Sequence, residues 1–188
     1  MRWTLTFLLP CLLATASAKE QPLAACPDKA IEAVYRISND GGEAEEIIFK
    51  VKSTGKKIAS FPSGGFGTEV PELLWSSDGR LAAVSIRTTR NTRNLMVFHV
   101  TADEAKQVQL QDFTQNIYGR LGILRGTGSS SNKPLRWLAA DRLLISAWGA
   151  LENEDWYDYE VELTVIQDAG NRVGWLEKIT DVKKEKEE

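Results

Sequence analysis

Alternating apolar and polar residues in short runs dominate the chain and predict a protein built mainly from β-strands. Residues 159–165 alternate strictly, with valine and leucine on one face and carboxylates on the other, as in a half-buried strand. Residues 94–100 are apolar on both faces, which is typical of a strand covered on both sides. Turn-forming clusters at residues 39–42 and 77–79 separate the runs, and about eleven strands are expected in all.

A single helix is expected to interrupt this pattern within residues 111–132. Apolar residues recur at helical spacing from Phe113 to Leu124, and Asp112 is placed to cap the first turn. The glycine- and serine-rich residues 126–131 then predict an exposed loop.

The chain also contains an internal repeat. Residues 74–85 and residues 136–146 have the pattern of two similar hairpins, each with a tryptophan near its start. A second hairpin follows each of them, so that blade-like units covering roughly residues 45–110 and 133–180 are expected.

Within the first of these hairpins, residues 75–85 resemble the tryptophan-serine-proline-aspartate-glycine hairpin of TolB-like and related WD-type β-propellers. Residues 94–98 are similar to the third strand of such a blade. Ser77 stands where the pattern has proline, and the second unit lacks the aspartate-glycine turn, so the chain has one good copy. The resemblance covers roughly residues 45–180 and implies a blade-like fold but no particular function, because propellers support binding and catalysis alike.

The number of strands limits how far this resemblance extends. A closed propeller takes at least four blades of four strands, or about sixteen strands, and about eleven cannot complete such a ring. The sequence therefore predicts an all-β fold: an antiparallel meander of two to three propeller-blade-like sheets, not a closed ring, with one short helix. Residues 19–182 are expected to form this single domain, with residues 111–132 covering an exposed sheet face. Closure of the ring by oligomerisation is the alternative.

Residues 1–18 have the features of a secretory signal peptide. A positive residue near the start precedes the apolar residues 5–14, and the Ala-Ser-Ala of residues 16–18 is a small-residue cleavage site. No later segment is long and apolar enough to predict a transmembrane span, and the charged residues 183–188 are expected to be a disordered tail. The chain is therefore predicted to be extracytoplasmic, either periplasmic or secreted, with its mature form beginning at Lys19.

Cys26 is the single cysteine that would remain after that cleavage, so no intrachain disulfide is expected. The preceding Leu-Ala-Ala is similar to a bacterial lipobox. Pro22 and charged residues separate it from the apolar segment, however, which argues against a lipid anchor at Cys26. A buried free thiol, a lipidated thiol and an intermolecular disulfide remain as alternatives, and the buried thiol is favoured.

The composition is that of an ordinary globular domain and excludes several classes of function. The chain has 188 residues, of which 43% are hydrophobic and 26% charged, and its formal net charge of −3 does not fit a nucleic-acid-binding protein. His99 is its single histidine, and the sequence has no Gly-x-Ser-x-Gly turn, no P-loop and no Cys/His ligand cluster. Consequently no catalytic residue, cofactor or metal ligand is assigned, and enzyme activity is not favoured.

Two polar segments at equivalent positions of the two units provide the candidate binding residues. The connection in the first unit contributes Arg87, Arg90 and Arg93. The equivalent segment of the second unit is acidic and aromatic, and its candidates are Glu152, Asp155, Trp156 and Tyr157. If the units stack, both segments emerge at one rim, where they either pair with each other or form a recognition surface. Arginine and the large aromatic residues dominate binding energy at typical interfaces.

These features favour a noncatalytic extracytoplasmic module that binds another protein or serves as a scaffold. The alternative is an envelope glycan-binding or glycan-active protein that uses the acidic and aromatic residues 152–158. In that case the rings of Trp148, Trp156, Tyr157 and Tyr159 stack on sugars, and carboxylates of the segment supply acid and base. A third hypothesis is a structural subunit that completes a larger propeller or an oligomer. The sequence identifies neither the ligand nor the partner.

Overall fold

The structure is a computed structural model and describes residues 19–37, 44–64, 69–122, 129–151, 156–168 and 171–181. The expected signal peptide, the charged tail, and the candidate residues Glu152 and Asp155 lie outside these ranges. The described residues form twelve strands and one helix. In chain order these are β1 (Lys19–Pro22), β2 (Ile31–Ile37), β3 (Ala44–Val51), β4 (Lys57–Pro62), β5 (Glu72–Trp75), β6 (Leu81–Thr89), β7 (Thr92–Val100), β8 (Ala105–Leu110), α1 (Phe113–Leu121), β9 (Ser130–Trp137), β10 (Arg142–Ala150), β11 (Trp156–Asp168) and β12 (Asn171–Asp181).

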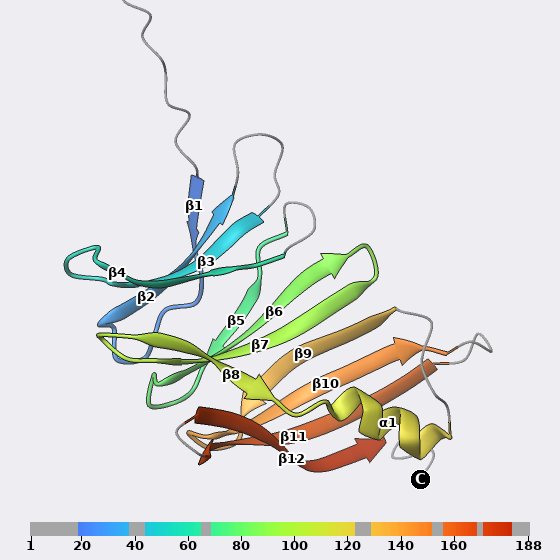
Figure 1. Ribbon diagram of the computed structural model, residues 1–188. Coiled ribbons are helices and arrows are strands. Elements are labelled where there is room, and N and C mark those ends of the chain that lie inside the picture. The colour runs from blue at the N-terminus through green and yellow to red at the C-terminus, as the bar shows by residue number, and fades with distance from the viewer. Residues whose placement is uncertain are drawn as a thin grey trace, which may run out of the picture.

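Three consecutive antiparallel meanders of four strands make up the fold (Figure 1). The first meander, β1 to β4, forms a separate sheet, in which the strands lie side by side in the order of the chain. The second meander joins β5 to β8, and the third joins β9 to β12. The prediction of an all-β chain with one short helix is therefore confirmed.

The second and third meanders combine into a closed barrel. On one side β8 pairs in parallel with β12, with Gln109 opposite Val173. On the other side β7 pairs in parallel with β9, with Thr92 opposite Ser130. These two pairings close a ring of six strands in the order β7-β8-β12-β11-β10-β9, and β6 and β5 continue the sheet from the other edge of β7.

The prediction of blade-like sheets that do not form a closed ring is wrong, and so is the resemblance to TolB-like and WD-type propellers. Stacked blades would leave the edges of each sheet unpaired with the next sheet. Here the edge strands β8 and β12 hydrogen-bond to each other, and the edge strand β9 pairs with β7, so that three of the four edges are paired and, among the described strands of these two meanders, only β5 keeps a free edge. The expected number of about eleven strands is close to the twelve observed. The number of strands, however, does not specify which sheet edges pair with each other.

The two tryptophans of the repeat take equivalent local positions in spite of this different architecture. Trp75 and Trp137 each end the first strand of a meander, and both are half-buried. The indole Nε1 of Trp75 donates to the carbonyl oxygen of Ala24 at 2.8 Å, and that of Trp137 donates to the carbonyl oxygen of Leu74 at 3.1 Å. The sequence repeat therefore corresponds to two similar hairpins, each with an indole that hydrogen-bonds to a backbone carbonyl. It does not correspond to a propeller blade.

Alternate residues of the barrel strands fill the barrel interior. Leu143 lies opposite Leu163, and Ile145 lies opposite Val161, and all four side chains are buried. This alternation is the one that residues 159–165 predicted.

Helix α1 packs against the same core. Asp112 caps it as predicted, because its Oδ1 accepts hydrogen bonds from two backbone N–H groups of the first turn at 3.0 and 3.2 Å. Phe113 and Ile117 are buried in the barrel core, and Arg120 donates to the carbonyl oxygen of Ile179 at 2.9 Å. The helix ends at Leu121, earlier than the apolar spacing suggested. It covers the barrel core and not the face of an open blade.

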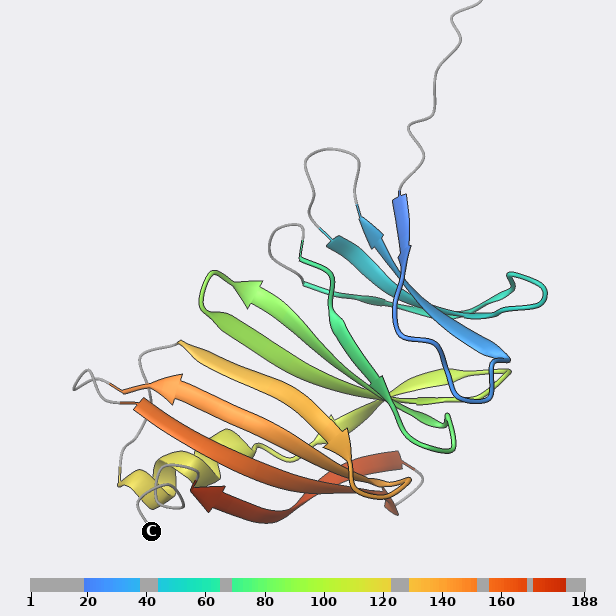
Figure 2. The same cartoon turned by 180° about the vertical axis from the view of Figure 1, so that it is seen from behind.

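A second core lies between the first sheet and the strands β6 and β7 (Figure 2). Ala82, Val84 and Ile86 of β6 pack toward the first sheet, whereas Ala83 belongs to the barrel core. Strand β6 is therefore buried on both faces, which explains its continuous apolar sequence. Phe49 of the first sheet meets Phe98 of β7 with a ring-centroid distance of 5.3 Å.

Cys26 belongs to this second core and is 2% exposed. Its Sγ donates to the carbonyl oxygen of Gly79 at 3.5 Å. Gly79 has φ +71°, and a Cβ at this position would lie 2.8 Å from the Cys26 sulfur, so both the turn and the packing require glycine. Burial raises the pKa of the Cys26 thiol to about 12. The structure thus describes a free, enclosed and protonated thiol.

Two glycines offer a matched test of the barrel packing. A Cβ at Gly149 would lie 2.5 Å from the hydroxyl oxygen of Tyr157, the residue opposite it, whereas a Cβ at Gly119 in α1 would meet no atom within 4 Å. We expect Gly149→Ala to lower the free energy of unfolding by about 1–3 kcal/mol through overpacking. Gly119→Ala should raise it by about 0.5–1 kcal/mol, since alanine favours the helix. Urea denaturation measures both; equal effects of the two substitutions would contradict the packing described.

Candidate functional site

One end of the barrel, called the rim here, brings together the β6–β7 turn, the start of β9, the end of β10 and the start of β11. The strand register connects them in a row, because Arg93 lies opposite Ser131, Ser131 opposite Trp148, and Trp148 opposite Asp158. Figures 1 and 2 both show these strand ends on the same side of the molecule. The arginine-containing turn and the described part of the aromatic segment, at the start of β11, therefore lie at one end of the barrel.

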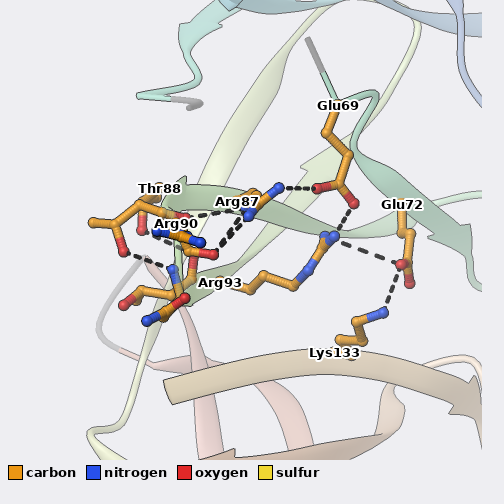
Figure 3. Close-up of polar contacts among 10 residues, drawn as sticks. Glu69, Glu72, Arg87, Thr88, Arg90, Arg93 and Lys133 are labelled. Carbon is orange, nitrogen blue, oxygen red and sulfur yellow. Dashed lines mark hydrogen bonds and ion pairs between the residues drawn. The ribbon is translucent and has the colours of Figure 1, made fainter. Parts of the chain in front are cut away.

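A chain of alternating charges crosses the rim (Figure 3). Glu69, which precedes β5, pairs through its two carboxylate oxygens with Arg87 at 3.4 Å and with Arg93. Arg93 lies 4.0 Å from Glu72 of β5, and Glu72 accepts a 2.8 Å hydrogen bond from Nζ of Lys133 on β9. Two of the three predicted arginines, Arg87 and Arg93, thus have acidic partners in front of and within β5.

The three predicted arginines differ in how many of their guanidinium N–H groups bind other residues of the protein. Arg87 donates from Nε to the carbonyl oxygens of Thr89 and Arg90, both at 3.2 Å, and from Nη2 to the Arg90 carbonyl at 2.6 Å, so it holds its own turn together. The side chain of Arg93 is 16% exposed and bonds to Glu69. Arg90 is exposed, and its side chain makes no hydrogen bond or ion pair with any described residue. Of the three, Arg90 is the one whose guanidinium no described residue engages.

Tyr157 is buried, which corrects its assignment to the binding surface. It is 3% exposed, lies opposite Gly149 and meets the ring of Tyr118 edge-on at a centroid distance of 6.1 Å. Burial, together with the neighbouring Tyr118, raises the pKa of the Tyr157 hydroxyl. The alternation of β11 turns this side chain inward, so it belongs to the core that α1 covers.

Two large aromatic side chains do face outward at the rim. Trp156 is 49% exposed and Trp148 is 41% exposed. Trp148 lies opposite Asp158 and Trp156 opposite Ala150, so the two tryptophans are diagonal neighbours on one face of β10 and β11. Trp148 was predicted only as a sugar-stacking residue of the glycan alternative and not as part of the protein-binding rim. The alternation of β10, which buries residues 143, 145 and 147, was the signal that places it outside.

A cavity of about 540 Å³ lies beside these tryptophans and is called the rim cavity. Its lining residues come from the segment before β5, the β6–β7 turn and the strands β9 and β10: Glu69, Arg87, Arg90, Asn91, Thr92, Arg93, Ser129, Ser131 and Trp148. Its walls combine three guanidinium groups, several hydroxyl and amide groups, and one aromatic ring. Such a site suits binding by charge and stacking.

The described residues show little that would suit catalysis. His99 is half-buried on β7, and burial together with nearby arginines lowers the pKa of its imidazole. No group of three or more His, Cys, Asp or Glu side chains in the described ranges is placed to hold a metal ion. Helix α1, the one helix found there, has nine residues and is too short to span a bilayer.

Comparisons with known proteins give little further guidance. No protein-family model matches the sequence, and no curated protein matches it. A structure of Kluyveromyces lactis Hsv2 with its complete loop 6CD is similar at 16% identity and a TM-score of 0.44, over 88% of this chain and 48% of that chain. A second Hsv2 structure, with loop 6CD replaced by a Gly-Ser linker, is 14% identical with a TM-score of 0.46, over 86% of this chain and 45% of that one. The chain spans about half the length of these structures, and similarity at this level transfers no function.

The different roles of the arginines predict different effects on stability. Arg93→Gln removes the central member of the charge chain and should lower the free energy of unfolding by about 1–3 kcal/mol, because Glu69 and Glu72 lose a largely buried partner. Arg90→Gln, the matched change in the same turn, should alter it by no more than about 0.5 kcal/mol. Denaturant titration of both variants provides the comparison, and a destabilised Arg90 variant with an unchanged Arg93 variant would reverse the assignment.

Proposed function

We propose that this protein is a noncatalytic protein-interaction module that binds its partner through the barrel rim. The observation that carries the proposal is the pair of exposed tryptophans, Trp148 and Trp156, beside the rim cavity and the Arg90 guanidinium, which no described residue engages. Tryptophan and arginine are the residue types most enriched among the positions that dominate interface energy. Both tryptophans stand on barrel strands, so little conformational entropy is lost when a partner packs against them.

The binding surface is rigid for a physical reason. Trp148 and Trp156 project from hydrogen-bonded neighbouring strands, and the buried pair Gly149 and Tyr157 fixes the backbone beneath them. A preorganised aromatic surface of this kind favours specific binding. The proposal therefore concerns recognition and not chemistry.

Substitution of the tryptophans tests the binding role. A partner identified by crosslinking in envelope extracts should lose at least about tenfold in affinity for Trp148→Ser or Trp156→Ser, because each change removes a large anchor from the interface. Trp175→Ser is the matched control, since Trp175 is 42% exposed but lies on β12, opposite Thr164 toward the other end of β11. Surface plasmon resonance gives the affinities. Unchanged affinity in both rim variants would refute the proposal, and binding of all variants to a glycan array would favour the glycan alternative.

The proposal places the module outside the cytoplasm with a mature chain that begins at Lys19, and the pairing of β1 favours this cleavage site over one in front of Cys26. Strand β1 begins at Lys19 and pairs along its whole length with β2, and Glu20 forms ion pairs with Arg36 and Lys50 at 3.1 and 2.8 Å. Cleavage after residue 18 would leave β1 intact. Cleavage in front of Cys26 would delete it and expose the edge of β2.

Mass spectrometry of the protein recovered from the cell envelope tests this arrangement. We expect a mature chain that begins at Lys19, carries no acyl group and has one thiol. Because the pKa of the Cys26 thiol is raised to about 12, its thiolate is scarce below pH 9, and a thiol reagent should react only after unfolding. A chain that begins at Cys26 with the added mass of a lipid, or a thiol that reacts rapidly in the native protein, would contradict the prediction.

A further inference from the structure

The rim cavity carries more positive charge than its own carboxylate balances. Arg87, Arg90 and Arg93 line it, and Glu69 is the one acidic residue among its lining residues in the described part of the chain. The whole chain has a net charge of −3, so this is a local concentration of positive charge on an acidic protein. A concave surface of this kind attracts anions, and guanidinium groups pair with carboxylates through well-directed hydrogen bonds.

Two polar atoms in the cavity wall have no hydrogen-bond partner among the described residues: Nη1 of Arg93 and Oγ of Ser131. Ser131 is 3% exposed. Nη1 of Arg93 lies 4.0 Å from Oε1 of Glu72, which is beyond hydrogen-bond distance. Buried polar atoms are almost always paired, so these two atoms are suited to a further oxygen in the cavity. Neighbouring side chains must shift to admit it, because neither atom is open to solvent.

Glu69 shows how this site holds a carboxylate. Its two oxygens pair separately with Arg87 and Arg93, while its side chain remains 37% exposed at the cavity surface. Arg90 lies in the same wall with its guanidinium unused by described residues. The arrangement is a carboxylate site already in use by a residue of the chain itself, with one further arginine available.

We propose that the rim cavity binds a side-chain carboxylate of an acidic segment in the partner protein, and that Glu69 competes for the same arginines in the free protein. Trp148 borders the cavity and packs against the apolar part of that segment, while Arg90 and Arg93 take its carboxylate. The proposal rests on the proposed function for the source of the carboxylate. It adds the chemistry of recognition and a built-in competitor.

Calorimetric titration of the full chain with a blocked hexaglutamate peptide tests this inference, with a blocked hexaglutamine peptide as the uncharged comparison. We expect the acidic peptide alone to bind, and its affinity to fall as salt is added. Glu69→Gln should strengthen binding about tenfold, because it removes the competing charge while keeping an oxygen that accepts from the arginines. Arg90→Gln should weaken binding about tenfold.

Arg142→Gln provides the matched control, because Arg142 is exposed at the opposite end of β10 from Trp148 and should leave the affinity unchanged. Equal binding of hexaglutamine, or the same affinity in wild type, Glu69→Gln and Arg90→Gln, would overturn the inference. An oligogalacturonate that binds where hexaglutamate does not would overturn it in favour of an acidic sugar. Should Glu69→Gln fail to fold, Arg90→Gln and the salt dependence still decide the matter.

The two proposals fail in different ways. If hexaglutamate does not bind while Trp148→Ser still abolishes partner binding, the carboxylate site is refuted and the interaction surface stands. If hexaglutamate binds with the expected response to Glu69→Gln but the tryptophan variants bind the partner normally, the carboxylate site stands and the tryptophan-based surface is refuted.

Discussion

Two short parallel pairings join the second and third meanders, and the rest of the structure depends on them. The pairing of β7 with β9 comprises two residue pairs, and that of β8 with β12 comprises two more. So few backbone contacts need support from side chains. At one seam Gly174 lets Leu110 approach, since a Cβ there would lie 2.7 Å from Leu110 Cδ2. At the other, the charge chain that ends in Glu72 and Lys133 ties β5 to β9.

Closing the barrel also builds the candidate binding surface. The β7–β9 seam places Arg93 beside Ser131, and β9 in turn places Ser131 beside Trp148. Structural and binding roles are therefore mixed among neighbouring side chains. Arg87 and Arg93 stabilise the turn and the seam, whereas Arg90 and the exposed tryptophans remain at the surface. A ligand that engages Arg93 would act on the same contacts that hold the barrel shut.

Local features of the sequence predicted local features of the structure. The strict alternation of residues 159–165 identified a strand with one buried face, and Asp112 marked the start of the helix, because both signals depend on neighbours in the chain. The same alternation, carried back along β11, would have placed Tyr157 inside and Trp156 outside. Residues 152–155 are polar and do not alternate, and a polar segment next to the alternating run favoured the surface for the aromatic residues that follow it.

The sequence by itself determined an all-β chain, the hairpins whose first strands end at Trp75 and Trp137, and the capped helix. Only the tertiary structure decided that the strands close into a six-stranded barrel, that Glu69 and Glu72 are the partners of Arg87 and Arg93, and that Trp148 faces outward beside them. The physical reason is that alternation and turn chemistry act over a few residues. Edge pairing and ion pairing join residues far apart in the chain, such as Lys133 and Glu72, whose approach depends on how whole sheets pack.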